Sequence, residues 1–220
     1  AVCAELAQRT GDGFHPATNL FAVMASHDAL VQAMAQLRRL AVTLLKMAND
    51  IRLLACGPRA GLGELLLPAN EPGSSIMPGK VNPTQCEAMG MLCTQVIGMD
   101  AAVAAAGAGG HLQMNVYKPL IGFNLIEGIR LLQDGCRCFR LNLVNGMEPD
   151  RERIAFYVER SLMLVTALTP EIGYEKACAI AQHAHRDGLT LREAAMQSGA
   201  ITCDRFDRLI DPAAMASPHR

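Results

Sequence analysis

Two long stretches of this chain carry apolar side chains at alternating spacings of four and three residues. That spacing is typical of helices packed against neighbours along their whole length. The clearest stretch runs from about Ser26 to Ala55 and has two apolar stripes. The first stripe consists of Leu30, Met34, Leu37, Ala41, Leu44, Ala48, Ile51 and Ala55, and the second of Ala33, Leu40, Met47 and Leu54. Because a surface helix needs only one apolar stripe, two stripes predict a helix that is covered on more than one side.

Two further long helices are expected. One is expected from Pro83 to Ala106, with Asn82 as its N-cap and Pro83 in its first turn. The other is expected from about Tyr117 to Val144. Its predicted seam is Leu125, Ile129, Leu132, Cys136, Phe139 and Leu143. Such helices exceed the usual globular mean of about 11–12 residues. We therefore expect an all-α chain whose long helices form a bundle, as is common for helices shared between subunits.

Composition and charge exclude several other classes of protein. Half of the residues are apolar, which excludes disorder, and only 4% are aromatic, which disfavours a β-sandwich. The formal net charge is −1 with the two signs interspersed, so no nucleic-acid or membrane-surface partner is expected. The most apolar window, Ala88 to Ala106, contains Thr94, Gln95 and Asp100 without a flanking basic cluster. It is predicted to be a buried helix rather than a membrane span.

The eight cysteines favour free thiols over a disulfide framework, because Cys86, Cys93 and Cys178 lie inside apolar runs. The expected compartment is therefore a reducing one, the cytoplasm, or the mitochondrial matrix in a eukaryote. No CxxC pair is present. Cys136 with Cys138, and likewise His183 with His185, are two residues apart on predicted helices and so face different ways. No metal ion and no cofactor are expected.

The character of the chain changes near Gly146. Charged residues number 20 among the last 75 positions against 21 among the first 145. Shorter helices are expected after this point: one is capped by Asp150, one starts at Pro170, and one carries a capping box of Thr190 and Glu193. Gly188 and Gly199 stand where helices should stop. We expect a central helical domain over residues 1–146 and a small helical domain over residues 147–220.

A segment rich in glycine and proline interrupts the long helices at Gly57 to Pro83, with five of each in 27 residues. A loop of this length in a compact domain is usually functional or disordered, and its Leu and Ile residues disfavour disorder. Its second half places Ser74, Ser75, Lys80 and Asn82 just before a predicted helix N-terminus, which attracts anions. Two interpretations stand at this point: an anion site with a reactive hydroxyl, or a connector with incidental polar residues.

The sequence from Gly73 to Pro83, GSSIMPGKVNP, resembles the GSSxMPxKxNP signature of the fumarase/aspartase superfamily. Gly79 and the following Thr84 to Ala88 are similar to class II fumarases rather than to aspartases. The similarity extends over essentially all 220 residues, but only over the C-terminal half of a full-length family member. The resemblance implies a bundle of the fumarase/aspartase type, a homotetramer, and reversible hydration of fumarate to L-malate without a metal.

The resemblance also implies roles for individual residues. Ser74 would be the base that removes the C3 proton of malate, and Glu87 would support catalysis. Ser75, Lys80, Val81 and Asn82 would bind the substrate. The field that makes Ser74 basic is expected from Lys80, from the helix N-terminus and from loop amides around Gly73 and Gly79.

The family's second catalytic histidine and its N-terminal substrate loops are expected outside these 220 residues, since none of the six histidines has a matching context. The chain begins at Ala1 without an initiator Met, as a processed form or a fragment would. It is therefore expected to be inactive by itself and to contribute one part of a composite site. Two alternatives remain: another lyase of the superfamily such as aspartase, and a non-catalytic helical oligomerisation fragment.

Overall fold

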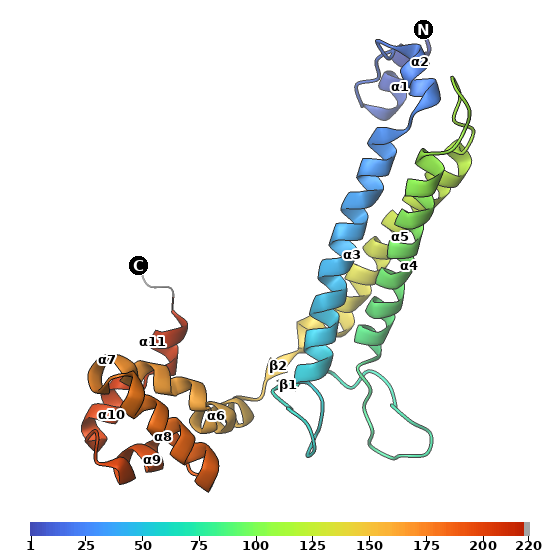
Figure 1. The fold of residues 1–220 in the computed structure, drawn as a ribbon. Helices are drawn as coiled ribbons and strands as arrows, with labels where there is room; N and C mark the ends of the chain where they lie inside the picture. The colour runs from blue at the N-terminus through green and yellow to red at the C-terminus, as the bar shows by residue number, and fades with distance from the viewer. Residues whose placement is uncertain (218–220) are drawn as a thin grey trace. The chain divides into compact units, whose positions relative to one another are not determined.

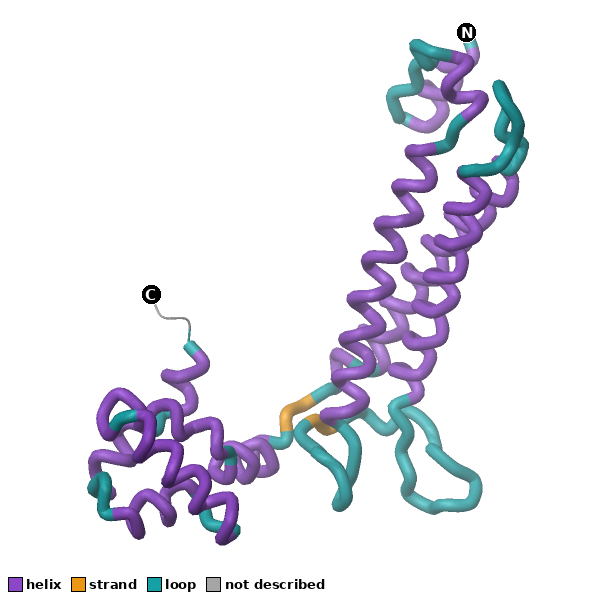
Figure 2. Tube along the Cα trace, viewed as in Figure 1, coloured by secondary structure: helices purple, strands orange, loops and turns teal. Residues whose placement is uncertain are grey.

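The computed structural model describes residues 1–217, which form two compact units. One unit ends at Glu148 and the other begins at Pro149, two residues beyond the expected boundary. Each unit has its own hydrophobic core. Helices make up most of the described chain and only two short strands accompany them, which agrees with the predicted all-α class (Figure 2).

Three long helices dominate the first unit and lie side by side (Figure 1). They are α3 (Asp28–Leu54), α4 (Thr84–Gly107) and α5 (Lys118–Asn142). Each falls within two residues of its predicted bounds, so the three predicted long helices are confirmed. The unit also contains the short elements α1 (Val2–Thr10), α2 (Leu20–Ala25), β1 (Leu65–Leu66) and η1 (Val144–Gly146). At the unit boundary, β2 (Glu148–Pro149) pairs with β1 in a two-stranded sheet.

Helix α4 packs against both α3 and α5 and supplies much of the core. Its buried residues recur at spacings of three and four: Cys86, Met89, Cys93, Val96, Met99, Val103 and Ala106. Among residues 1–217, α4 is the one helix long and apolar enough to cross a membrane, judged by length and composition. The core helix of a bundle passes the same test, and α4 has its buried stripe against two neighbouring helices.

The first stripe of α3 faces this core, with Met34, Ala41 and Ala48 fully buried. The second stripe is not covered within the chain, since Leu40 and Met47 are each almost half exposed. Large apolar side chains are also exposed on the other two helices, among them Met91 on α4 and Phe123 on α5. The bundle therefore presents apolar surface beyond its own core.

The predicted seam of α5 is wrong at one position. Ile129 is 47% exposed, and the neighbouring Gly128 faces the core instead. A Cβ at Gly128 would lie 3.2 Å from the methyl carbon of Met34. Met34 thus occupies the space that a side chain at position 128 would need, and this rotates the buried stripe by one residue. The other seam residues of the helix, Leu125, Leu132, Cys136 and Phe139, are buried or half-buried.

An asparagine joins α4 to α5 at the end of the bundle remote from the long loop. The side chain of Asn115 is fully buried, and its Nδ2 donates to the carbonyl of Ala106 at 2.9 Å. Its Oδ1 accepts from the backbone N–H of Tyr117 at 2.9 Å. One side chain thereby satisfies a carbonyl at the end of α4 and an amide at the start of α5, where the helices leave polar groups unpaired.

The second unit consists of short helices around a core that includes Leu168, Ile180, Leu191 and Phe206. The elements are α6 (Arg151–Arg160), η2 (Leu162–Leu168), α7 (Thr169–Ile172), α8 (Tyr174–Asp187), α9 (Leu191–Ser198), α10 (Cys203–Leu209) and α11 (Pro212–Ala216).

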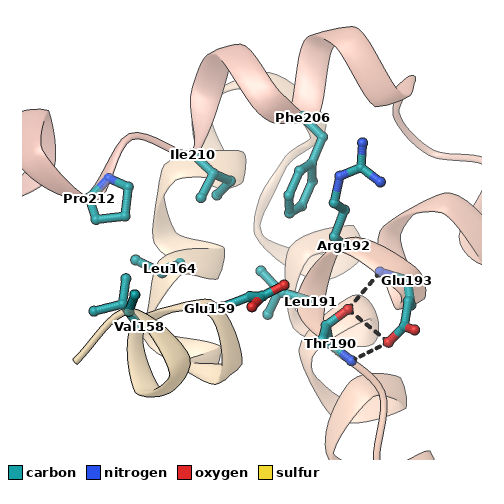
Figure 3. A pocket seen from close by; sticks show the side chains of 11 residues that line it. Val158, Glu159, Leu164, Thr190, Leu191, Arg192, Glu193, Phe206, Ile210 and Pro212 are labelled. Atoms are coloured by element: carbon teal, nitrogen blue, oxygen red, sulfur yellow. Dashed lines mark hydrogen bonds between the residues drawn. The ribbon is translucent and has the colours of Figure 1, made fainter. Parts of the chain in front are cut away.

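The predicted caps of this unit are confirmed. Asp150 accepts from the N–H of Arg153 at 2.9 Å. The Thr190 hydroxyl and the Glu193 carboxylate form the reciprocal capping box (Figure 3). Gly188 and Gly199 take left-handed conformations after α8 and α9. The helix expected to begin at Pro170 is only the short α7, because Gly173 ends it before α8 begins.

All eight cysteines are free, as predicted, and two of them differ sharply from the rest in environment. Cys86 and Cys93 are buried in the bundle, and burial raises the pKa of the Cys93 thiol to about 11. Cys56 and Cys138, by contrast, are exposed in the chain.

We predict that Cys93 resists alkylation while Cys56 and Cys138 react readily. The thiolate is the reactive form, and a thiol with a pKa of about 11 has roughly one thousandth of its population as thiolate at pH 8. Timed alkylation followed by peptide mass spectrometry should show Cys93 labelled only after denaturation. Labelling of Cys93 as fast as Cys56 in the native protein would contradict the described packing of α4.

Candidate active site

The long loop that joins α3 to α4 lies at one end of the bundle (Figure 1). Its start is tied back to the helix it leaves, since the backbone N–H of Glu64 donates to the carbonyl of Leu54 at 2.8 Å. Its only regular element within residues 1–217 is the two-residue strand β1. The second half of the loop, Gly73 to Asn82, forms a separate closed ring, called here the signature loop.

Gly73 closes the signature loop through both of its backbone polar groups. Its N–H donates to the carbonyl of Lys80 at 2.7 Å, and its carbonyl accepts from Nδ2 of Asn82 at 2.7 Å. This close approach requires glycine, because a Cβ at this position would lie 2.6 Å from the Lys80 carbonyl oxygen and 2.8 Å from the Asn82 nitrogen. Gly79 also serves the turn, with φ at +77°.

Ser74 lies half-buried inside this closed loop. Its Oγ accepts two hydrogen bonds, from the backbone N–H of Ile76 at 3.1 Å and from that of Met77 at 3.2 Å. Two amide dipoles aimed at one oxygen favour negative charge on that oxygen. The donors are not the amides expected from the sequence: the N–H of Gly73 is used by Lys80, and Ile76 and Met77 take its place.

The other proposed binding groups of the loop face solvent. Ser75, Lys80 and Val81 are exposed, and the Lys80 ammonium has no hydrogen-bond or ion-pair partner among residues 1–217. An ammonium group held next to a helix N-terminus and left without a partner is suited to bind an anion. The loop thus presents a fixed hydroxyl oxygen and an available cation within seven residues of one another in sequence.

Asn82 does not cap α4, and this sequence prediction is wrong. The N-cap is Pro83, whose carbonyl accepts from the N–H groups of Cys86 and Glu87 at 2.9 and 3.2 Å. The reason is competition for the Asn82 side chain, which donates to Gly73 across the loop instead. A carboxamide has two N–H donors and one carbonyl acceptor, so Asn82 keeps further capacity to bind a ligand.

Glu87 lies in the first turn of α4 and forms an ion pair with Arg52 in the last turn of α3. The distance from Arg52 Nη2 to Glu87 Oε1 is 3.0 Å. Both residues line a groove of about 690 Å³ between the two helices. The groove is lined by Leu45, Asn49, Arg52, Cys86, Glu87, Gly90, Met91, Thr94 and Gln95. Sequence reasoning missed Arg52, because nothing in the spacing of α3 marks this arginine as facing α4.

A second ion pair joins the same two helices further along the bundle. Arg38 Nε lies 2.9 Å from Asp100 Oδ2, with the aspartate largely buried. Asp100 is thus paired across the bundle rather than aimed at the signature loop. In the second unit His183 pairs with Asp187 on its own helix.

The second unit contains a cavity of about 580 Å³ that involves none of the predicted site residues (Figure 3). Its walls are mainly apolar, with Val158, Leu164, Phe206 and Ile210 among them. Of the charged residues that line it, Arg192 pairs with Asp207 and Glu193 belongs to the capping box, whereas Glu159 is exposed. No group of three or more His, Cys, Asp or Glu residues suited to a metal ion occurs within residues 1–217.

Comparison with known proteins gives consistent matches over the whole chain. A family model described as Lyase matches residues 1–98, and one described as Fumarase C C-terminus matches residues 164–217. A curated protein from Parasynechococcus marenigrum (strain WH8102), named Fumarate hydratase class II, is 90% identical over 219 residues. These are 100% of this chain and 47% of that protein. A protein of the same name from Prochlorococcus marinus (strain MIT 9313) is 65% identical over 97% of this chain and 46% of its own length.

Solved structures agree with the sequence matches. The crystal structure of recombinant class II fumarase from Schistosoma mansoni superimposes with a TM-score of 0.93 at 44% identity. It is matched over 100% of this chain and 49% of that chain. A crystal structure from Brucella melitensis, described as fumarate lyase:delta crystallin bound to cobalt, superimposes with a TM-score of 0.91 at 42% identity. The match covers 98% of this chain and 47% of that chain. The chain spans about half the length of the curated relatives it matches.

We predict that Gly73→Ala opens the signature loop, because the added methyl group would overlap backbone atoms of Lys80 and Asn82. Hydrogen exchange measured by mass spectrometry should show loss of protection between Gly73 and Asn82, with α4 protected as before. The matched control is Gly79→Asn, since no atom lies within 4 Å of a Cβ there and asparagine tolerates a positive φ. Equal protection in the Gly73→Ala and wild-type loops would show that the closure is not needed.

Proposed function

This chain belongs to the lyase family of the class II fumarases, within the fumarase/aspartase superfamily, and we propose that its protein reversibly hydrates fumarate to L-malate. The observation that carries the proposal is the closed signature loop, in which Ser74 Oγ accepts from two backbone amides and Lys80 is exposed. The chain would supply this loop to a site completed by other parts of the protein and its assembly.

In the direction of dehydration, Ser74 acts as the base at C3 of malate. The serine oxygen takes the C3 proton, and the electron pair of that C–H bond delocalises onto the adjacent carboxylate as an enediolate. The pair then forms the C2–C3 double bond while the C2 hydroxyl takes a proton from an acid in the part of the site that this chain does not supply and leaves as water. Fumarate remains, and the serine releases the C3 proton to solvent. A serine alkoxide is costly at neutral pH, and the amides of Ile76 and Met77 lower that cost by stabilising charge on Oγ.

The remaining loop residues bind the two carboxylates of the substrate. Lys80 supplies positive charge, while Ser75, Val81 and the unused donor of Asn82 supply further contacts. Charge that develops on the enediolate is greater than that on the ground-state carboxylate at the same place. A cation fixed there therefore stabilises the transition state more than the bound substrate. Glu87, one turn into α4, supports the reaction from the groove next to the loop.

A chimaera provides the test of this function. In it, the 220 residues replace the matching stretch of the 90% identical relative from Parasynechococcus marenigrum. We expect the chimaera to hydrate fumarate, which is followed by the loss of fumarate absorbance. Ser74→Ala in the chimaera should lower kcat by about 10²–10⁴-fold with KM little changed, since it removes an interaction made in the transition state.

Deuterium exchange at C3 of malate separates the two serines. Ser74→Ala should abolish exchange, whereas Ser75→Ala should raise KM and keep exchange. Wild-type exchange and kcat in Ser74→Ala would exclude Ser74 as the base. Deamination of aspartate without hydration of fumarate would favour an aspartase, and a folded chimaera without either activity would favour a non-catalytic role for this chain.

We further propose that the protein assembles as a homotetramer through α3, α4 and α5. This proposal is supported by the apolar residues left exposed on these helices, such as Leu40, Met91, Phe123 and Ile126. A monomer rarely exposes large contiguous apolar patches, and long helices of this kind commonly belong to shared bundles.

Sedimentation velocity on the chimaera should give a particle of four chains. Replacing Phe123 and Ile126 together by Glu should lower the assembly state, because four chains would bury charge at the packed helix faces. Met163→Glu is the matched control, since Met163 is an exposed apolar residue of the second unit. A monodisperse monomer of the wild-type chimaera would contradict this assembly.

A further inference from the structure

The ion pair between Arg52 and Glu87 holds one oxygen of the Glu87 carboxylate from the neighbouring helix α3. We propose that Arg52 is a positioning residue for Glu87: it fixes the carboxylate in the orientation that supports the reaction. This inference rests on the proposed function, because it concerns the same site. Arg52 itself is not placed in contact with the substrate.

The geometry of the pair leaves one side of the carboxylate free. Arg52 Nη2 donates to Glu87 Oε1 at 3.0 Å, and Oε2 has no hydrogen-bond partner within the described chain, which ends at residue 217. The backbone of Glu87 is fixed independently, since its N–H donates to the carbonyl of Pro83. One oxygen is therefore held by α3, while the other is available to a group that reaches the groove.

The surroundings of the Arg52–Glu87 pair argue against a mainly structural role for this pair. Within the single chain the side chains of Arg52 and Glu87 are 54% and 39% exposed, and a pair exposed to this degree adds little to the stability of the bundle itself. The packing of α3 on α4 is provided by buried residues such as Ala48 and Met89. An arginine that lines the same groove as Glu87, and that contributes little to folding, is better explained by what it does to Glu87.

The bundle offers a matched control for this interpretation. Arg38 and Asp100 form an ion pair between the same two helices, at 2.9 Å and with Arg38 exposed to 52%. Arg38 does not line the groove that contains Glu87. Removing either arginine deletes one α3–α4 ion pair, but only Arg52→Gln releases Glu87.

The experiment compares Arg52→Gln, Arg52→Lys, Arg38→Gln and Glu87→Gln in the chimaera. We expect Arg52→Gln to lower kcat by about 10- to 100-fold, the scale of a misplacement of about 1 Å, with KM changed less than about twofold. Arg52→Lys should recover part of the rate, because it keeps the charge but loses the planar fork. Arg38→Gln should keep kcat within about twofold of wild type. Thermal unfolding should show a small change for Arg52→Gln and a larger one for Arg38→Gln, because the latter leaves the largely buried Asp100 carboxylate without its partner.

The double variant Arg52→Gln/Glu87→Gln completes the test. If Arg52 acts through Glu87, the double variant is no slower than Glu87→Gln alone. The inference is overturned if Arg52→Gln keeps the wild-type kcat, or if Arg52→Gln and Arg38→Gln lower kcat equally. It is also overturned if the two single losses of kcat multiply in the double variant, or if Glu87→Gln leaves kcat unchanged.

These results remain distinct from failure of the proposed function. If the wild-type chimaera hydrates fumarate and Glu87→Gln slows it, an unaffected Arg52→Gln refutes only the role of Arg52. A wild-type chimaera that lacks hydratase activity refutes the proposed function and this inference with it.

Discussion

The burial of α4 against α3 and α5 is the packing on which the rest of the first unit depends. Met89, Val96 and Val103 are at most 1% exposed, and each such side chain contributes about 1.5–3 kcal/mol when removed from water. The Arg52–Glu87 ion pair between α3 and α4 is partly exposed, and pairs of that kind contribute about 0–1 kcal/mol. Apolar packing therefore sets the relative positions of the helices, which leaves the charged groups at their ends free to serve other purposes.

Much of this architecture could be predicted from the sequence because it depends on local rules. The spacing of apolar residues gave the three long helices, and Asp150, Thr190 with Glu193, Gly188 and Gly199 marked helix ends through side-chain and backbone chemistry close in sequence. The errors arose where a distant contact decided the outcome. Met34 on α3 takes the space at Gly128, and this moves the buried stripe of α5 off Ile129.

In the candidate site, too, some features could be predicted from the sequence and others depend on the folded chain. Its residues could be found because GSSIMPGKVNP is a contiguous motif, and the motif alone names Ser74, Lys80 and Asn82. What could not be predicted is how they are used. Asn82 has the residue type of a helix cap, yet its amide closes the loop on Gly73. The amides that donate to Ser74 are placed by the folded backbone of the loop. The arginine that pairs with Glu87 lies on another helix, 35 residues away in sequence. Neither interaction leaves a signal in residue spacing.

The two hydrogen bonds from Gly73 also bear on the entropy of ligand binding. A flexible segment of ten residues would lose much conformational freedom on closing around a small dianion, at about 1–2 kcal/mol per residue ordered. With its ends already joined at Gly73, Lys80 and Asn82, the loop has lost much of that freedom during folding. A ligand with only two carboxylates offers few contacts, and a loop ordered in advance lets nearly all of their energy appear as affinity.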